Sequence, residues 1–176
     1  MLRRPLKTIL CICLFAGSAC LNASANDLET VIRAGNSAYE AGDFDKAQSL
    51  YSNVLAADPW HAVALNNRGL SYERMGRLEA AARDLTQALE RHPENGTIWN
   101  NRANVNCALK RVGRSVFDRM QALYTGRFTA AQAQTGLRRS GFYRGPSDGI
   151  WGYDSEDALE DWTRAGCPRA PGSRLI

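Results

Sequence analysis

The feature that most constrains this chain is a pattern that returns after 34 residues. A first copy runs from Gly35 to Pro59 and a second from Gly69 to Pro93. The matching positions inside the two copies are Gly42 and Gly76, Ala47 and Ala81, and Tyr51 and Leu85. A repeat of this length is typical of stacked helix–turn–helix units, each of which buries its apolar face against the next unit.

The residue types explain why each copy would fold as a pair of helices. Gly35 and Ala47 are small, so two antiparallel helices can approach closely there, and Gly42 suits the turn because glycine adopts left-handed backbone at low cost. The closing Pro59 cannot continue a helix and therefore begins the next unit. The pattern resembles the tetratricopeptide repeat at nearly every signature position. This resemblance implies an all-α array of about three helical hairpins.

A weaker third copy spans residues 95–125. It keeps Trp99 and the close-contact pair Ala103 and Ser115, but Arg119 replaces the tyrosine or leucine and Arg127 replaces the proline. We interpret it as a degenerate hairpin, with a pair of helices unrelated to the repeat as the alternative. The first two copies then cover residues 27–60 and 61–94. Helices are expected at 27–41, 44–57, 61–75, 78–91, 96–110 and 113–125.

Residues 1–25 are expected to be a signal peptide rather than part of a fold. Arg3, Arg4 and Lys7 precede an apolar run, and Ala23-Ser24-Ala25 offers small residues for cleavage. Cys20 follows a Gly-Ser-Ala sequence that resembles the end of a bacterial lipobox, so a lipid anchor at Cys20 remains the alternative. We therefore expect an exported, periplasmic protein, or otherwise an envelope lipoprotein. No other segment predicts a membrane span.

The charge is unevenly distributed. The whole chain has a net charge of +4, but residues 102–144 hold 9 basic residues against a single acid. This block predicts an anionic partner, such as a cell-wall polymer, lipid headgroups or an acidic protein, or else a solvated basic face beside acidic neighbours. Export argues against nucleic acid. Cleavage leaves only Cys107 and Cys167 of the five cysteines, and whether they form a disulfide stays open.

The segment 126–168 carries a second resemblance, followed by a tail at 169–176. Its elements are Gln134, Gly141-Phe142-Tyr143, Asp148-Gly149-Ile150-Trp151-Gly152, and then Ser155, Ala158, Leu159 and Trp162. In order and spacing they are similar to the peptidoglycan-binding-like domain, which implies a small three-helix module. Ala133, Ser140 and Thr163 depart from the family pattern, and Cys167 stands where the family often has leucine.

The second resemblance implies a candidate peptidoglycan-binding set. Its members are Arg138, Arg139, Tyr143, Arg144, Asp148 and Trp151. The Asp-Gly-Ile-Trp-Gly stretch favours a role in the fold over contact with glycan, because turn glycines and periodic aromatics usually serve packing. Arg138 and Arg139 also precede a helix end, where cations stabilise the helix dipole.

The sequence contains no recognisable catalytic set, so we expect a protein that is not an enzyme and that needs no cofactor. Its two histidines, His61 and His92, lie at repeat boundaries, and two imidazoles without a Cys-x-x-Cys pair do not indicate a metal site.

Asparagines recur on the first helix of each expected hairpin. They are Asn36, Asn66, Asn67, Asn100, Asn101 and Asn104. In tetratricopeptide arrays these helices line a groove, so the resemblance implies that the amides hold the backbone of a bound peptide. A frequent helix variant without this role is the alternative. The lysines of the family's carboxylate clamp are missing, because Ile32 and Thr97 stand at those positions.

These observations together predict an exported scaffold or adaptor of the cell envelope. The repeats would bind a protein or peptide, and the C-terminal module would tether the protein to peptidoglycan. The alternative is an accessory or regulatory subunit of a cell-wall hydrolase or synthase, in which the C-terminal module contacts protein rather than glycan.

Overall fold

The computed structural model describes residues 25–168, and within this range every element is a helix. The eight helices are α1 (Ala25–Glu40), α2 (Phe44–Ala57), α3 (Ala62–Arg74), α4 (Leu78–Arg91), α5 (Gly96–Ala108), α6 (Val112–Tyr124), α7 (Ala130–Arg139) and α8 (Tyr153–Arg164). The predicted signal peptide, Cys20 and the tail at 169–176 lie outside the described residues, apart from Ala25, with which α1 begins.

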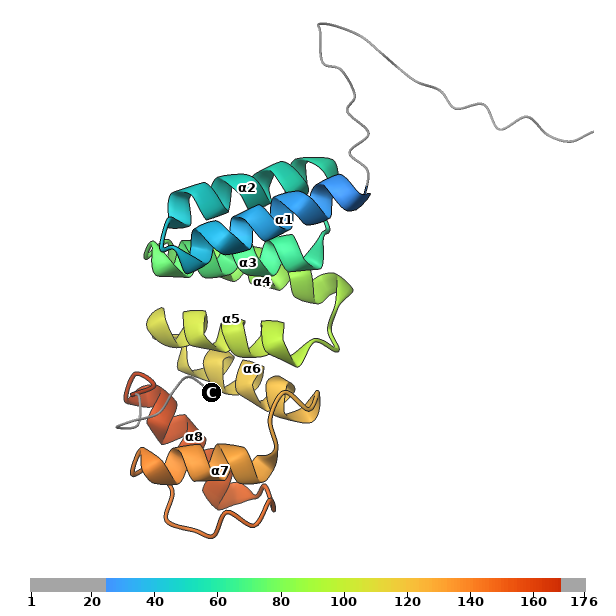
Figure 1. Ribbon diagram of the computed structural model, residues 1–176. Helices are drawn as coiled ribbons and strands as arrows, with labels where there is room; N and C mark the ends of the chain where they lie inside the picture. The colour runs from blue at the N-terminus through green and yellow to red at the C-terminus, as the bar shows by residue number, and fades with distance from the viewer. Residues whose placement is uncertain (1–24, 169–176) are drawn as a thin grey trace, which may run out of the picture.

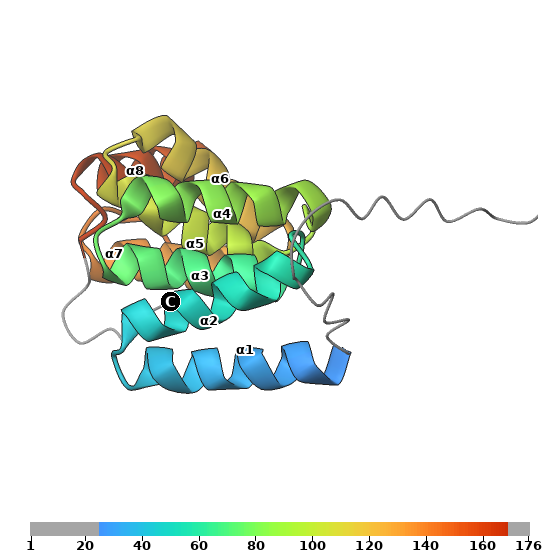
Figure 2. The same ribbon diagram turned by 90° about the horizontal axis from the view of Figure 1, so that it is seen from above.

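Helices α1 to α6 form three antiparallel hairpins that stack in chain order (Figure 1). The expected all-α repeat array is therefore confirmed, and all six helix ranges agree with the structure to within two residues at either end. In Figure 1, α1, α3 and α5 follow one another down the stack, and in Figure 2, seen from above, all three run across the view in roughly the same orientation. Helix α3 contacts both α1 and α5, so the first helices of the hairpins form a common layer.

The close contacts inside the hairpins lie where the small residues predict them. A Cβ atom at Gly35 would stand 2.6 Å from Cε1 of Tyr51, and one at Gly69 would stand 3.1 Å from Cγ of Leu85. In the third hairpin, Ala103 and Ser115 are fully buried, and the Ser115 hydroxyl donates to the Ala103 carbonyl oxygen. A larger side chain at these positions would force the two helices of a hairpin apart.

The turns of the three hairpins share one backbone conformation but not one residue type. Gly42 and Gly76 have φ of 81° and 74°, while Lys110, at the equivalent place in the third hairpin, has φ of 57°. A left-handed backbone is strained for a lysine and unstrained for a glycine. The third hairpin therefore makes the same turn at a higher conformational cost.

The core divides into two clusters. The larger one, with Leu65, Leu85 and Ile98 at its centre, runs through the stacked hairpins from α1 to α5. The smaller one consists of Leu137, Tyr143, Ala158 and Leu159, and it is completed by Val116 and Met120 of α6 and by Trp151 and Trp162. The C-terminal segment thus has too few buried residues for a core of its own and packs on the third hairpin.

One expectation about the C-terminal segment is not confirmed. The described residues 126–168 form two helices, α7 and α8, and not the three of the expected peptidoglycan-binding-like module. The residues between α7 and α8 form turns around Gly149, whose φ is 80°. Within the described residues no helix follows α8, because residues 165–168 leave the helix through Gly166, with φ of 88°.

Candidate functional site

The asparagines of α1, α3 and α5 join into a hydrogen-bonded ladder across the three hairpins. Asn67 donates through Nδ2 to Asn36 Oδ1 at 2.9 Å, and its own Oδ1 accepts from Asn66 at 2.9 Å. Asn101 then donates to Asn66 Oδ1, also at 2.9 Å. We call the surface formed by Asn36, Asn66, Asn67 and Asn101 the amide face.

A second residue fixes the first rung of the ladder. The hydroxyl of Tyr51, on α2, donates to Asn36 Oδ1 at 2.8 Å, so this one oxygen accepts two hydrogen bonds. Tyr51 is 1% exposed, and burial raises the pKa of its phenol. With Oδ1 occupied, the Nδ2 of Asn36 is the atom of this side chain that can meet a ligand.

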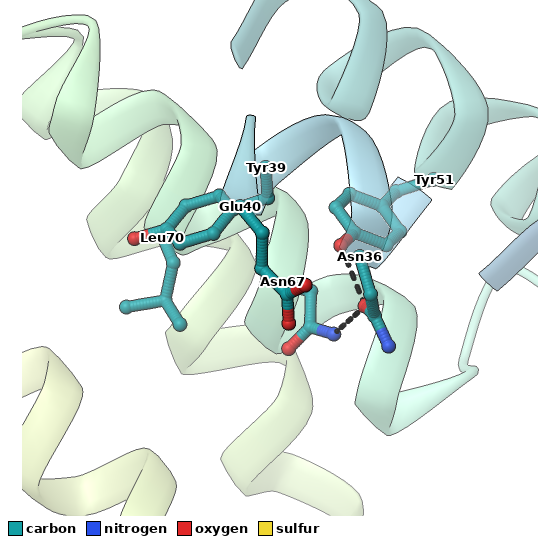
Figure 3. Close-up of a pocket in the computed structure, with 6 residues that line it drawn as sticks. All are labelled: Asn36, Tyr39, Glu40, Tyr51, Asn67 and Leu70. Atoms are coloured by element: carbon teal, nitrogen blue, oxygen red, sulfur yellow. Dashed lines mark hydrogen bonds between the residues drawn. The ribbon is translucent and has the colours of Figure 1, made fainter. Parts of the chain in front are cut away.

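A hollow of about 170 Å³ lies at this end of the amide face. It is lined by Asn36, Tyr39, Glu40, Tyr51, Asn67 and Leu70. Figure 3 shows the amide groups of Asn36 and Asn67 meeting between the ring of Tyr51 and the side chains of Glu40 and Leu70. The hollow is small and open, and Glu40 is the charged residue in its lining, so it suits one side chain of an extended segment better than a small molecule.

Two ion pairs lie in neighbouring hairpins and recur 34 residues apart, the period of the repeat. Arg68 binds both oxygens of Asp84 at 2.7 and 2.9 Å and donates to the Ser52 hydroxyl at 3.1 Å. Arg102 binds Asp118 and the Thr86 hydroxyl in the same way. Each arginine thus joins its own hairpin to the preceding one. The hydrogen bond with Asp84 raises the pKa of Arg68, which stays charged.

The other two predicted groove residues lie in a different environment. The carbonyl oxygens of the Asn100 and Asn104 side chains accept from Arg119, at 3.3 and 2.9 Å. Arg119 is 9% exposed, and Trp162 covers its guanidinium. These two asparagines are therefore held by the third hairpin and do not belong to the amide face.

The predicted peptidoglycan-binding residues fall into two groups. Arg138, Arg139 and Arg144 are exposed around the end of α7. Tyr143, Asp148 and Trp151 instead serve the fold: Tyr143 is buried, the Asp148 carboxylate accepts from the Ile150 amide at 3.0 Å, and Trp151 packs in the second core. The structure does not bring the six together as one binding surface.

Gln134 organises this C-terminal segment. It is fully buried in α7, donates to the carbonyl oxygen of Ile150 at 2.9 Å and to the Ser155 hydroxyl at 3.2 Å, and accepts from the Gly149 amide at 3.0 Å. One amide side chain therefore ties α7, the turn before Trp151 and the start of α8 together. The sequence motif marked Gln134 but did not reveal this role.

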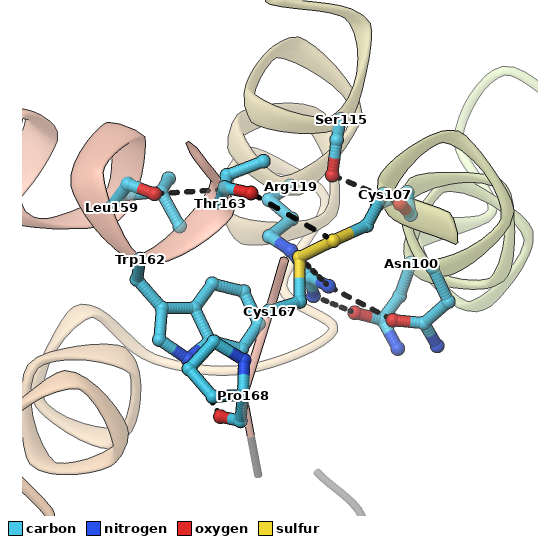
Figure 4. Close-up of a disulfide and its surroundings, with 11 residues drawn as sticks. Asn100, Cys107, Ser115, Arg119, Leu159, Trp162, Thr163, Cys167 and Pro168 are labelled. Atoms are coloured by element: carbon cyan, nitrogen blue, oxygen red, sulfur yellow. Dashed lines mark hydrogen bonds between the residues drawn. A yellow bond between two sulfur atoms is a disulfide. The ribbon is translucent and has the colours of Figure 1, made fainter. Parts of the chain in front are cut away.

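Cys107 and Cys167, left unassigned by the sequence, form a disulfide with their Cα atoms 6.4 Å apart. The bridge joins the end of α5 to the residues that follow α8 (Figure 4). No group of histidine, cysteine or acidic residues within 25–168 is arranged to hold a metal ion. No helix in that range has the length and apolar character needed to cross a membrane.

The comparisons agree with the repeat architecture. A model of the tetratricopeptide repeat family matches residues 32–82 and again 66–128, together more than half of the chain. The TPR repeat-containing thioredoxin TTL4 of Arabidopsis thaliana is 31% identical over 71 residues, or 40% of this chain and 10% of that protein. Hsp70-Hsp90 organizing protein 1 of Glycine max is 39% identical over 61 residues, or 35% of this chain and 11% of that protein. The chain therefore spans about a tenth of the length of these curated relatives.

Solved structures of the same fold extend the likeness beyond the three hairpins. The first TPR domain of Spaghetti (RPAP3), bound to an HSP90 peptide, has a TM-score of 0.61 and 16% identity, covering 84% of this chain and 99% of that one. The Sgt2 TPR domain from Aspergillus fumigatus has a TM-score of 0.59 and 18% identity, covering 91% of this chain and 94% of that one. At this identity the likeness concerns the fold alone.

Proposed function

Because the chain belongs to the tetratricopeptide repeat family, we propose that its amide face binds an extended segment of a partner protein. The observation that carries the proposal is the asparagine ladder, which presents amide groups along three neighbouring helices beside a hollow sized for one side chain. Amide side chains can both donate to and accept from a peptide backbone, so they suit a ligand held by its main chain.

The charge at the site indicates which segment it takes. The structurally similar Spaghetti domain is bound to an HSP90 peptide, and the family's clamp for a terminal carboxylate uses lysines. Here those positions hold Ile32, which is 3% exposed and part of the core, and Thr97. The amide face therefore suits an internal, uncharged stretch of a partner rather than an acidic C-terminus.

A peptide array tests this function. Labelled protein is passed over overlapping peptides from candidate partners, and bound peptides are titrated against the parent, Asn67→Ala and Arg138→Glu. Asn67→Ala should weaken binding about fivefold, because one hydrogen bond contributes about 1 kcal/mol. Arg138→Glu lies on the C-terminal segment and should bind like the parent. Equal binding of all three proteins would contradict the proposal.

We further propose that the protein is exported and acts as a scaffold of the cell envelope. The charged start, the apolar run and the Ala-Ser-Ala sequence support export, and the disulfide fits an oxidising compartment. Mass spectrometry of the mature protein tests this. An N-terminus at Asn26 supports signal-peptide cleavage, a lipidated Cys20 indicates an envelope lipoprotein, and an intact Met1 in the cytoplasm contradicts export.

Two versions of this function differ in the role of the C-terminal segment. The exposed Arg138, Arg139 and Arg144 would attract the carboxylates of peptidoglycan, and this tether is our first proposal. Since Tyr143 and Trp151 are used in packing, contact with a cell-wall hydrolase or synthase is the second. Protein that pellets with purified sacculi, and pellets less after Arg138→Glu with Arg144→Glu, supports the tether. Protein that stays in the supernatant at low salt supports the second version.

A further inference from the structure

The third hairpin buries a cation, Arg119, that has no acidic partner of its own among the described residues. The guanidinium of Arg119 donates to the amide oxygens of Asn100 and Asn104 and to the sulfur of Cys167, and its Nε has no hydrogen-bond partner within the described residues. The neighbouring carboxylate of Asp118 is already held by Arg102. Burying a charge is costly unless a counter-charge compensates it, so the buried guanidinium of Arg119 is suited to bind an anion.

The end of the chain covers this cation. The guanidinium carbon of Arg119 lies 4.5 Å from the ring centroid of Trp162, and the Sγ of Cys167 accepts from Nη2 at 3.8 Å. The indole of Trp162 in turn donates to the carbonyl oxygen of Pro168 at 2.9 Å. Figure 4 shows Arg119 enclosed between this cover and Asn100. We call the end of α8 with residues 165–168 the cover.

The disulfide holds the cover in place. Cys167 belongs to the cover, and its bridge to Cys107 anchors it to α5 of the same hairpin. Apart from the bridge, α8 is held mainly by the small second core, in which only four residues are buried. A cover with so little apolar area beneath it depends strongly on a covalent link.

The covered site corresponds to the open end of the amide face. Asn104 and Arg119 stand 68 residues, or two repeats, after Asn36 and Tyr51, and the same hydrogen bond to an asparagine Oδ1 joins each pair. The position that opens to the hollow in the first hairpin is thus occupied in the third hairpin by the chain itself. Without the cover, the line of asparagines would continue to a cationic end.

We propose that Arg119, Asn100 and Asn104 form a carboxylate-binding site that the disulfide keeps closed and that reduction by a dithiol opens. The ligand is an aspartate or glutamate carboxylate that flanks the uncharged stretch of the partner segment, so the inference rests on the proposed function of the amide face. A planar guanidinium with a free Nε is suited to bind a carboxylate through two parallel hydrogen bonds.

The opening reaction is an ordinary thiol–disulfide exchange. A thiolate of the dithiol attacks one sulfur of the bridge, the sulfur–sulfur bond breaks, and the departing cysteine sulfur takes the electron pair and a proton. The second thiolate of the reductant then attacks the reductant's sulfur in the mixed disulfide, and the other cysteine leaves with the electron pair and takes a proton. Two electrons and two protons pass to Cys107 and Cys167, and the reductant becomes a disulfide.

Fluorescence anisotropy with two matched peptides tests the proposal. One peptide alternates glycine with glutamate over eight residues, and the other alternates glycine with glutamine. Reduction by dithiothreitol should strengthen binding of the glutamate peptide at least about fivefold, the effect of one ordinary hydrogen bond. Cys107→Ser with Cys167→Ser should bind it equally well without reductant, and Arg119→Gln should lose the gain while Arg119→Lys keeps part of it.

Each other outcome overturns the proposal. A gain below fivefold means that no carboxylate site opens, and a gain that survives in Arg119→Gln means that another cation binds the peptide. Circular dichroism must show that the reduced repeats still melt cooperatively, because their loss would mean that the bridge supports the fold. If the glutamine peptide binds the oxidised protein and Asn67→Ala weakens that binding, the proposed function of the amide face is supported, even if the proposal of a redox-gated carboxylate site is contradicted.

Discussion

The first and third hairpins hold equivalent residue pairs in opposite environments. In the first, Tyr51 fixes Asn36 at the edge of an open hollow, whereas in the third, Arg119 fixes Asn104 beneath Trp162. The backbone geometry is shared, so the difference comes from a single substitution of an aromatic phenol by a guanidinium and from the chain that covers it. A repeat therefore supplies a position, and the side chain at that position decides whether it binds a partner or part of its own chain.

The largest expected difference between the hairpins comes from the buried ion pair of the third. Asp118→Ala should destabilise the protein by about 3–5 kcal/mol, because it leaves Arg102 buried without a counter-charge. The first hairpin has Ala34 and Leu50 at these positions, so it contains no such pair.

Urea unfolding followed by circular dichroism measures this effect. Asp84→Ala is the matched control in the second hairpin, where Arg68 is slightly more exposed, and it should cost less. A loss below about 1 kcal/mol for Asp118→Ala would place the pair among weak surface ion pairs.

The next effect concerns the close contact in the first hairpin. Gly35→Ala should cost about 1–3 kcal/mol, because the new Cβ would overlap the ring of Tyr51 and displace its hydroxyl from Asn36. The third hairpin already accepts an alanine here, Ala103. Gly113→Ala, with no atom within 4 Å of the new Cβ, is the control and should not destabilise. Melting curves of Gly35→Ala that overlay those of the parent would show that Tyr51 can move freely.

A smaller effect should appear with the opposite sign at the turn of the third hairpin. Lys110→Gly should stabilise the protein by about 1 kcal/mol, because it removes left-handed backbone strain that the first two hairpins avoid with Gly42 and Gly76. Thermal unfolding monitors the gain, with Gly76→Lys as the reverse change. A loss of stability in Lys110→Gly would mean that the lysine side chain makes a compensating contact.

The hydrogen bond of Tyr51 should contribute a similar or smaller amount to the free energy of unfolding. Tyr51→Phe should cost about 0.5–1.5 kcal/mol, since it removes the donor to Asn36 without changing the size of the ring. The same variant should bind partner peptides less tightly, because Asn36 is then free to rotate. Unchanged peptide affinity would show that Asn67 alone orients Asn36.

The smallest effect is a difference in pH dependence above about pH 9. Burial raises the pKa of Tyr51, so its stabilisation is present below pH 10, its ordinary pKa, and is lost as the pH rises above that value. Burial lowers the pKa of Arg119 to about 10, so the cost of burying its charge is present at neutral pH and is relieved as the pH rises above 10. Tyr51→Phe should therefore flatten the fall in unfolding free energy at high pH, and Arg119→Met should steepen it. Parallel curves for the two variants would contradict the opposite assignments.

The helices were predictable from the sequence because the repeat has a strict period. Once Gly42, Gly76 and the prolines set the register, the apolar positions determined each hairpin and left few alternatives. The asparagines were predicted on the correct helices as well. Their ladder was not, because whether Asn101 meets Asn66 depends on the rotation between successive hairpins, which no single hairpin encodes.

The covered site shows where sequence reasoning stops. Arg119 was noticed only as a departure from the repeat, and Asn104 only as one amide among several. Comparing residues two repeats apart would have paired Arg119 with Asn104 on the example of Tyr51 with Asn36. The approach of Trp162 and Cys167 could not have been found in this way, because it depends on how α8 packs on α6.

The disulfide also determines how this chain would respond to mechanical force. Force applied to the two ends of the chain would be transmitted from Cys107 to Cys167 through the disulfide. The 60-residue loop between these cysteines would therefore carry no tension. While the bridge is intact, that loop cannot contribute the roughly 200 Å that a chain of its length spans when stretched. Under tension the first two hairpins would therefore extend, while α6, α7 and α8 kept their length.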